Sequence, residues 1–93
     1  LKQLQYLVAL EAHGHFGKAA DSCNVTQSTL SAGIRELETL LGLMLVERTR
    51  RVVRFTPLGL NIARKAHRVL REAEELAALA AGASQPLTGE LRM

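Results

Sequence analysis

Cysteine, proline and aromatic residues are all scarce in this sequence of 93 residues. It has 1 cysteine, 2 prolines, 1 tyrosine, 2 phenylalanines and no tryptophan. Cys23 therefore has no partner for a disulfide within the chain, which argues against a disulfide-stapled secreted domain. No apolar run reaches the roughly 20 residues that cross a membrane, and no signal peptide is recognisable. We expect a soluble, cytoplasmic domain with an aliphatic core and no membrane partner.

Catalytic and metal-binding patterns are also missing from the sequence. His13 and His15 flank a glycine, His67 falls in a predicted helix, and none has a partner at the spacings of zinc sites. Cys23 falls on the apolar side of a short predicted helix, which favours a small packing residue over a nucleophile. The sequence thus predicts no enzyme activity, no cofactor and no metal.

Positive charge is concentrated in the second half of the chain. The net charge is +3 and the pI is about 9.6, but between positions 35 and 71 nine basic residues face only three acidic ones. The basic residues are Arg35, Arg48, Arg50, Arg51, Arg54, Arg64, Lys65, Arg68 and Arg71. A basic block inside a folded pattern predicts a surface that binds a polyanion. An ordinary solvated helix face remains the alternative for the last four of them.

Hydrophobic periodicity predicts three short helices in the first half of the chain. Apolar residues recur near a 3.6-residue period over 1–13, and Gly14 ends this helix. A second helix over 16–23 ends before Asn24, a residue that tolerates a left-handed turn. Thr26 can cap a third helix over 27–41 by accepting a hydrogen bond from a free N–H of its first turn, and Gly42 ends it.

The third predicted helix has two distinct faces. An apolar stripe toward the other helices consists of Leu30, Ile34, Leu37 and Leu41. At 100° per residue, a separate polar face without acidic residues collects Gln27, Ser28, Ser31, Ala32 and Arg35. Gly33 lies at the centre of neither face. It is either a tolerated helix weakness of about 1 kcal/mol relative to alanine or the site of a close approach by another backbone.

A hairpin and a long helix are predicted to follow. Strand-like runs at 43–47 and 52–56 are joined by arginine-rich residues. Thr56 is then predicted to cap a long helix, with Pro57 at its first position, and this helix should end at about Ala81, before Gly82. Its apolar residues alternate in steps of four and three, the spacing of a short coiled-coil seam: Ile62, Ala66, Val69, Ala73, Leu76 and Ala80. Because this helix overshoots a core of three short helices, we expect a mostly intermolecular seam. With Leu58, it forms the predicted homodimer interface.

A helix, a tight turn and a second helix with a polar leading face, next to a basic hairpin, are typical of DNA-binding proteins. A helix fits the major groove of B-DNA, where amides and hydroxyls read base edges, while hairpin arginines such as Arg50 and Arg51 reach phosphates or the minor groove. The predicted fold is mostly α: a winged helix-turn-helix over 1–56, with a three-helix core and a two-stranded β wing, followed by a long linker and dimerisation helix over 57–81. Residues 82–93 are interpreted as a hinge and the start of an effector domain missing from the chain.

The stretch from Phe16 to Gly59, "FGKAADSCNVTQSTLSAGIRELETLLGLMLVERTRRVVRFTPLG", resembles the amino-terminal domain of LysR-type bacterial transcriptional regulators. The paired alanines, "QSTLS", "LE..LG", "L.ER" and "T..G" occur together at family spacing. Within the family, "YLVAL", "HF", "AADSC" and "MLVERTRRVVRFT" are most similar to the OxyR branch of peroxide-responsive activators.

The resemblance implies base contacts for Gln27, Ser28 and Ser31, a minor-groove contact for Arg51, and phosphate contacts for Lys18 and Thr29. The candidate DNA-binding residues are therefore Lys18, Thr26, Gln27, Ser28, Thr29, Ser31, Arg35, Arg50 and Arg51. Many family members have a basic residue at the position of Ala32 and a proline at the position of Ser28. Because of these two differences, the base preference of this chain does not follow directly from the family.

Partners also follow from the resemblance. It implies double-stranded operator DNA, a homodimer through the linker helix, a tetramer of full-length chains, and an effector domain that senses the signal, with RNA polymerase as a further candidate partner.

Four alternatives to a peroxide-responsive DNA-binding domain are considered. An enzyme would need a convergent polar site, and a winged-helix module that binds protein should show an exposed apolar patch rather than an arginine hairpin. A structural dimerisation segment explains residues 57–81 but not the polar face of the third helix. Within the family, the alternative is a regulator of a different effector.

Overall fold

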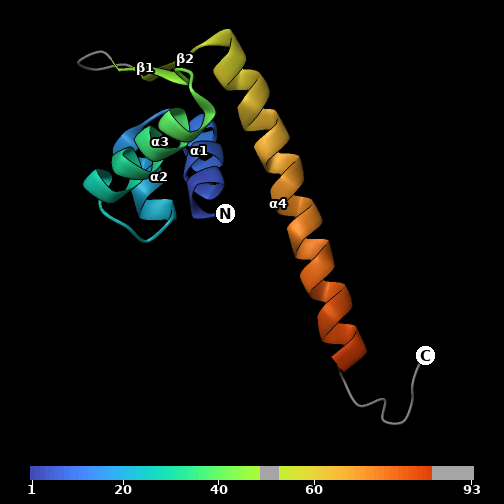
Figure 1. The fold of residues 1–93 in the computed structure, drawn as a ribbon. Coiled ribbons are helices and arrows are strands. Elements are labelled where there is room, and N and C mark those ends of the chain that lie inside the picture. Colours follow the sequence, from blue (N-terminus) through green and yellow to red (C-terminus); the bar gives the residue numbers. More distant parts are fainter. Residues whose placement is uncertain (49–52, 85–93) are drawn as a thin grey trace.

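A computed structural model describes residues 1–48 and 53–84 of the chain. Three short helices pack together: α1 (Lys2–His13), α2 (Phe16–Ser22) and α3 (Gln27–Leu41). A hairpin of β1 (Val46–Arg48) and β2 (Val53–Phe55) follows, and α4 (Pro57–Ser84) runs away from this core (Figure 1). The predicted fold, a mostly helical winged helix-turn-helix with a long final helix, is confirmed.

The hydrophobic core is mostly aliphatic, with Tyr6 as its buried aromatic residue, and α1 lies at its centre. This helix packs against α2, α3 and α4. The largest side chains with less than 2% exposure come from α1, α3 and the start of the hairpin: Leu7, Leu10, Leu30, Ile34, Leu45 and Val46. Burying one such side chain stabilises a fold by about 1.5–3 kcal/mol, so these residues fix how α3 and the hairpin sit on α1.

The helix ends follow the local signals in the sequence. Gly14 and Gly42 take left-handed conformations with φ of 66° and 73°, and Asn24 does so with φ of 59°. The hydroxyl Oγ1 of Thr26 accepts a hydrogen bond from the backbone N–H of Thr29 at 3.1 Å, so the predicted cap of α3 is confirmed. The second helix ends one residue early, at Ser22, with Cys23 as its C-cap.

Gly33 is required by a close approach, but the approaching group is an aromatic ring rather than a backbone. A Cβ atom at position 33 would lie 2.5 Å from Cδ2 and 2.8 Å from Cε2 of Tyr6. The Tyr6 side chain is only 8% exposed, so α1 and α3 pack closely at this point because residue 33 has no side chain.

The hairpin is shorter than predicted. Its antiparallel register pairs Val46 with Phe55, Glu47 with Arg54 and Arg48 with Val53. The first strand was predicted over 43–47, but β1 begins three residues later, at Val46. Just before it, the backbone N–H of Leu45 bonds to the side chain of Glu38 on α3, at 2.9 Å, and not to a neighbouring strand.

The final helix is longer than predicted. It continues through Gly82 to Ser84, so the expected end at Ala81 is wrong. A single glycine costs a helix only about 1 kcal/mol relative to alanine, which is too little to end one unless the backbone also turns. The hinge predicted from residue 82 onward begins inside α4, and its remaining residues, 85–93, lie outside the described part of the chain.

Candidate nucleic-acid interface

The polar face of α3 points outward from the helical core. Gln27, Ser28, Ala32 and Arg35 are exposed and Ser31 is half-buried. Together with Phe16 of α2, these residues line a shallow surface depression of about 400 Å³. The structure therefore brings together five positions that the helical periodicity placed on one face, and it adds Phe16, which was not among the predicted site residues.

The first turn of α2 lies against the side chain of Gln27. A Cβ atom at Gly17 would be 3.1 Å from Nε2 of Gln27 and 3.0 Å from Cε1 of His15. His15 is itself the cap of α2, because its Nδ1 accepts the backbone N–H of Lys18 at 3.2 Å. This role was not predicted from the sequence, because histidine is an unusual N-cap.

Thr26 and Thr29 form a reciprocal pair at the start of α3. Besides capping Thr29, the Thr26 hydroxyl donates a hydrogen bond to Oγ1 of Thr29 at 3.0 Å. Both side chains are exposed. This pairing holds the two hydroxyls at the amino-terminal end of α3, where free backbone N–H groups and the helix dipole favour an anion such as phosphate.

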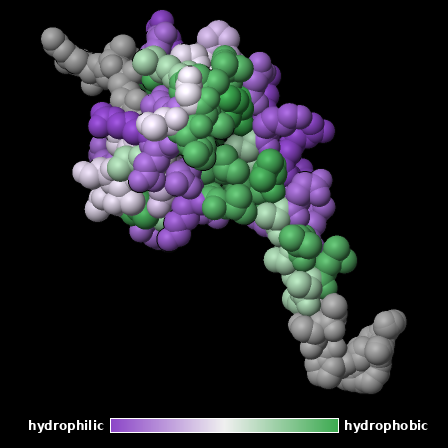
Figure 2. Space-filling model, in the orientation of Figure 1, coloured by the Kyte–Doolittle hydropathy of each residue, from purple (hydrophilic) through white to green (hydrophobic). Residues whose placement is uncertain are grey.

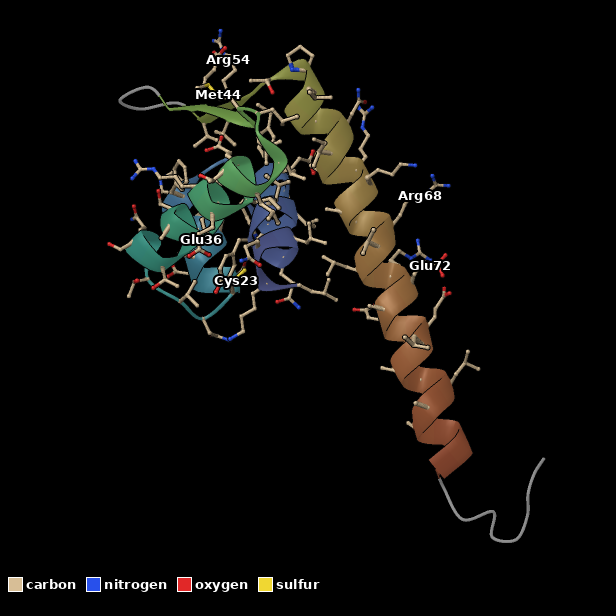
Figure 3. The ribbon with its side chains drawn as sticks, in the orientation of Figure 1. Cys23, Glu36, Met44, Arg54, Arg68 and Glu72 are labelled. Atoms are coloured by element: carbon tan, nitrogen blue, oxygen red, sulfur yellow. The ribbon has the colours of Figure 1, made fainter. Side chains whose placement is uncertain are left out.

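Exposed basic side chains also lie on α2 and on the hairpin. Lys18 is exposed near the start of α2. Arg54 on β2 projects away from the three-helix core (Figure 3) and is exposed; the charge pattern included it, but the site prediction did not. The predicted wing contacts, Arg50 and Arg51, lie outside the described residues.

The hairpin is fastened to α3 and α4 by two side chains that the sequence analysis did not assign to this role. Oε2 of Glu38 accepts hydrogen bonds from the backbone N–H groups of Leu45 and Val46. The Thr56 hydroxyl lies 3.0 Å from the carbonyl oxygen of Met44 and accepts the N–H of Gly59 at 2.8 Å. The predicted cap of α4 by Thr56 is confirmed, and it is also an anchor for the hairpin.

The predicted dimer seam on α4 divides into two parts, and its inner half needs correction. Ala66 is 2% exposed and Ile62 packs on the core of its own chain, so this part of the seam serves intramolecular packing. Ala73 is half-buried. Leu58, Val69 and Leu76 remain exposed, at 48%, 43% and 68%.

The exposed part of the seam is continuous with an apolar stretch further along α4. Figure 2 shows that α4 is largely hydrophobic beyond the three-helix core. At 100° per residue, Leu58, Val69 and Leu76 lie within about 20° of one another around the axis, whereas Arg68 and Glu72 project from the side that faces away from α1 (Figure 3).

Within 1–48 and 53–84, no three His, Cys, Asp or Glu side chains gather closely enough to hold a metal ion. No helix in this part of the chain is long and apolar enough to span a bilayer.

Comparison with known proteins identifies the family. Residues 1–60 match the model of the bacterial regulatory helix-turn-helix proteins of the lysR family. The chain belongs to the lysR family. The LysR-type domain is 48% identical over all 93 residues to a hydrogen peroxide-inducible genes activator from Pectobacterium carotovorum, of which it covers 31%. It is 52% identical, again over 93 residues and 31% of the relative, to the HTH-type transcriptional regulator EstR from Acinetobacter baylyi.

Solved structures of LysR-type proteins share the fold. A full-length OxyR variant from Pseudomonas aeruginosa superimposes with a TM-score of 0.88 at 41% identity, over 91% of this chain and 29% of that one. The DNA-binding domain of CbnR in complex with DNA superimposes with a TM-score of 0.84 at 28% identity, over 90% of this chain and 97% of that one. The LysR-type domain thus spans about a third of the length of its curated relatives, and those relatives are transcriptional regulators.

Proposed function

We propose that this chain is the sequence-specific DNA-binding domain of a LysR-type transcriptional regulator, and that it places α3 in the major groove of a dyad-symmetric operator. The observation that carries the proposal is the exposed face of α3, which offers an amide, hydroxyls, a methyl group and one arginine but no carboxylate. Amide and hydroxyl groups read base edges, and a methyl group can contact the methyl of thymine. The CbnR domain, similar in fold, is solved in complex with DNA.

The longer protein, in this proposal, is a cytoplasmic regulator of the OxyR type, and it is not an enzyme. The 48% identity of the domain, over all 93 of its residues, to a hydrogen peroxide-inducible genes activator supports the peroxide branch. A regulator of a different effector is the second candidate, and the 52% identity to EstR favours it. Operator binding by the full-length protein, measured before and after peroxide treatment, separates the two: only a regulator of the peroxide branch changes its binding.

Replacing Gln27 by alanine tests the role of α3. The protein's preferred duplex is first selected from a random DNA pool, and affinities are then measured for that duplex and for a scrambled one. A good bidentate base contact discriminates by about 1–3 kcal/mol, so Gln27→Ala should lower affinity for the selected duplex about tenfold or more and leave the scrambled duplex nearly unaffected.

Gln5→Ala is the matched control, because Gln5 is an exposed glutamine on α1, a helix that carries none of the proposed base contacts. This variant should bind both duplexes like the parent. Equal losses on the two duplexes for Gln27→Ala would make Gln27 a positioning group with no part in reading the sequence.

The exposed stripe of α4 is proposed as the dimer interface. Val69→Asp would place a charge at the centre of an apolar contact, and burying an unpaired charge is costly. We expect the dissociation constant of the dimer, measured by sedimentation, to rise at least about 100-fold. His67→Asp introduces the same charge about 160° away around α4 and should stay dimeric. A Val69→Asp protein that sediments as the parent dimer would move the interface elsewhere.

A further inference from the structure

Two backbone N–H groups at the entrance to the hairpin are bonded to a side chain of the recognition helix α3. Oε2 of Glu38 accepts the N–H of Leu45 at 2.9 Å and that of Val46 at 3.2 Å. Leu45 and Val46 are 0% and 1% exposed, and Glu38 is half-buried. Hydrogen bonds to an ionised acceptor are shorter and stronger than neutral ones, and unsatisfied buried N–H groups are strongly disfavoured. The carboxylate therefore fixes where the chain leaves α3 and enters β1.

The other side of the same peptide is held by the start of α4. The carbonyl oxygen of Leu45 accepts the backbone N–H of Thr56 at 3.0 Å and lies 3.3 Å from the Thr56 hydroxyl. That hydroxyl caps α4 through the N–H of Gly59. Hydrogen bonds thus run without a break from α3, through Glu38 and Leu45, to Thr56 and α4.

We propose that Glu38 is a positioning residue for DNA binding, which holds the β1–β2 hairpin and the base-facing helix α3 in one fixed geometry so that both contact the same half-site. The proposal rests on the DNA-binding function proposed above and deepens it. Glu38 itself lies near the end of α3, eleven residues beyond Gln27 and about 20° from it around the axis. Its carboxylate is bonded to the hairpin, so it acts through the hairpin rather than by touching DNA. A misplacement of the hairpin by about 1 Å is enough to lose directional contacts.

Three variants test this inference: Glu38→Ala, Glu38→Gln and, as the matched control, Glu36→Ala. Glu36 is an exposed glutamate on the same helix, bonded to Gln3 at 3.2 Å, so both alanine variants remove one negative charge from α3. Gln at position 38 keeps an oxygen that can accept both N–H groups. Each protein is footprinted with hydroxyl radicals on the selected duplex. The fraction of each protein that is active is determined by titration at stoichiometric DNA. Both measurements are made at a temperature where circular dichroism shows that the variant has the helix content of the parent.

We expect Glu38→Ala to lose about tenfold or more in affinity per active molecule, as for the loss of specific contacts. Its footprint should keep the protection of the sugar-phosphate backbone that flanks α3 and lose the protection of the backbone beside the hairpin. Glu38→Gln should recover most of the affinity and the full footprint, and Glu36→Ala should bind at least as tightly as the parent.

Two outcomes would overturn the inference. One is a complete footprint for Glu38→Ala with the affinity of Glu36→Ala. The other is a loss spread evenly over the footprint that disappears once the active fraction is accounted for, which would leave Glu38 a purely stabilising residue. A parent protein that protects no DNA at all would instead refute the DNA-binding function, and the positioning role with it.

Discussion

Replacing Gly59 with alanine should destabilise the domain more than the same substitution at any other glycine that the structure describes. The new Cβ would overlap the carbonyl oxygen of Leu45 and lie 2.8 Å from its carbonyl carbon. These are backbone atoms held by Glu38 and Thr56, so they have no room to shift. Overpacking costs about 1–3 kcal/mol and occasionally more. For a domain of this size, a loss of 3 kcal/mol lowers the melting temperature by roughly 10–20 °C.

Gly82→Ala provides the control in the same helix. A Cβ at position 82 would have nothing within 4 Å, so the substitution should be neutral or stabilising by up to about 1 kcal/mol through helix propensity. Thermal unfolding of both variants, followed by circular dichroism, gives the comparison. A Gly59→Ala protein that melts with the parent would mean that α4 does not start against Leu45 as described.

Gly33→Ala should also be strongly destabilising, although alanine is the better helix former. The added methyl group would lie 2.5 Å from the ring of Tyr6, which is buried between α1 and α3. Either the ring leaves its position or α3 moves away from α1, and we expect a net loss of about 2 kcal/mol. Because α3 carries the polar face, operator affinity should fall in the same variant.

A second substitution identifies the cause. In Gly33→Ala, replacing Tyr6 with leucine removes the rigid ring, including Cε2, and leaves methyl groups that can turn away from the added Cβ. The double variant should therefore be more stable than Gly33→Ala alone. The coupling free energy from the double-mutant cycle, measured by urea unfolding, should exceed about 1 kcal/mol. Additive effects of the two substitutions would show that position 33 is limited by something other than the Tyr6 ring.

Local rules explain which parts of the fold were predictable. The bounds of α3 and the caps Thr26 and Thr56 depend on residues within four positions of one another, and the predictions for them are confirmed. The outward face of α3 follows from helical geometry alone, and its exposure agrees with the predicted site. Whether these side chains contact DNA stays a prediction.

Contacts between distant parts of the chain were not predictable in this way. The Glu38 bonds to Leu45 and Val46 arise because two elements meet in space, and a glutamate on a helix carries no local sign of such a partner. Ala66 shows a related ambiguity, because apolar steps of four and three fit either the chain's own core or a second helix. Its burial against the core shows that the first answer holds for the inner half of α4.

Titration of the unmodified protein with its selected duplex and with a scrambled duplex of equal length and composition, at several salt concentrations, shows whether this domain reads DNA sequence. We expect the selected duplex to bind at least about 1,000-fold more tightly. We also expect the logarithm of the affinity for both duplexes to fall linearly with the logarithm of salt concentration, because phosphate contacts release counterions. Equal affinity for the two duplexes at every salt concentration would mean that the domain does not read DNA sequence.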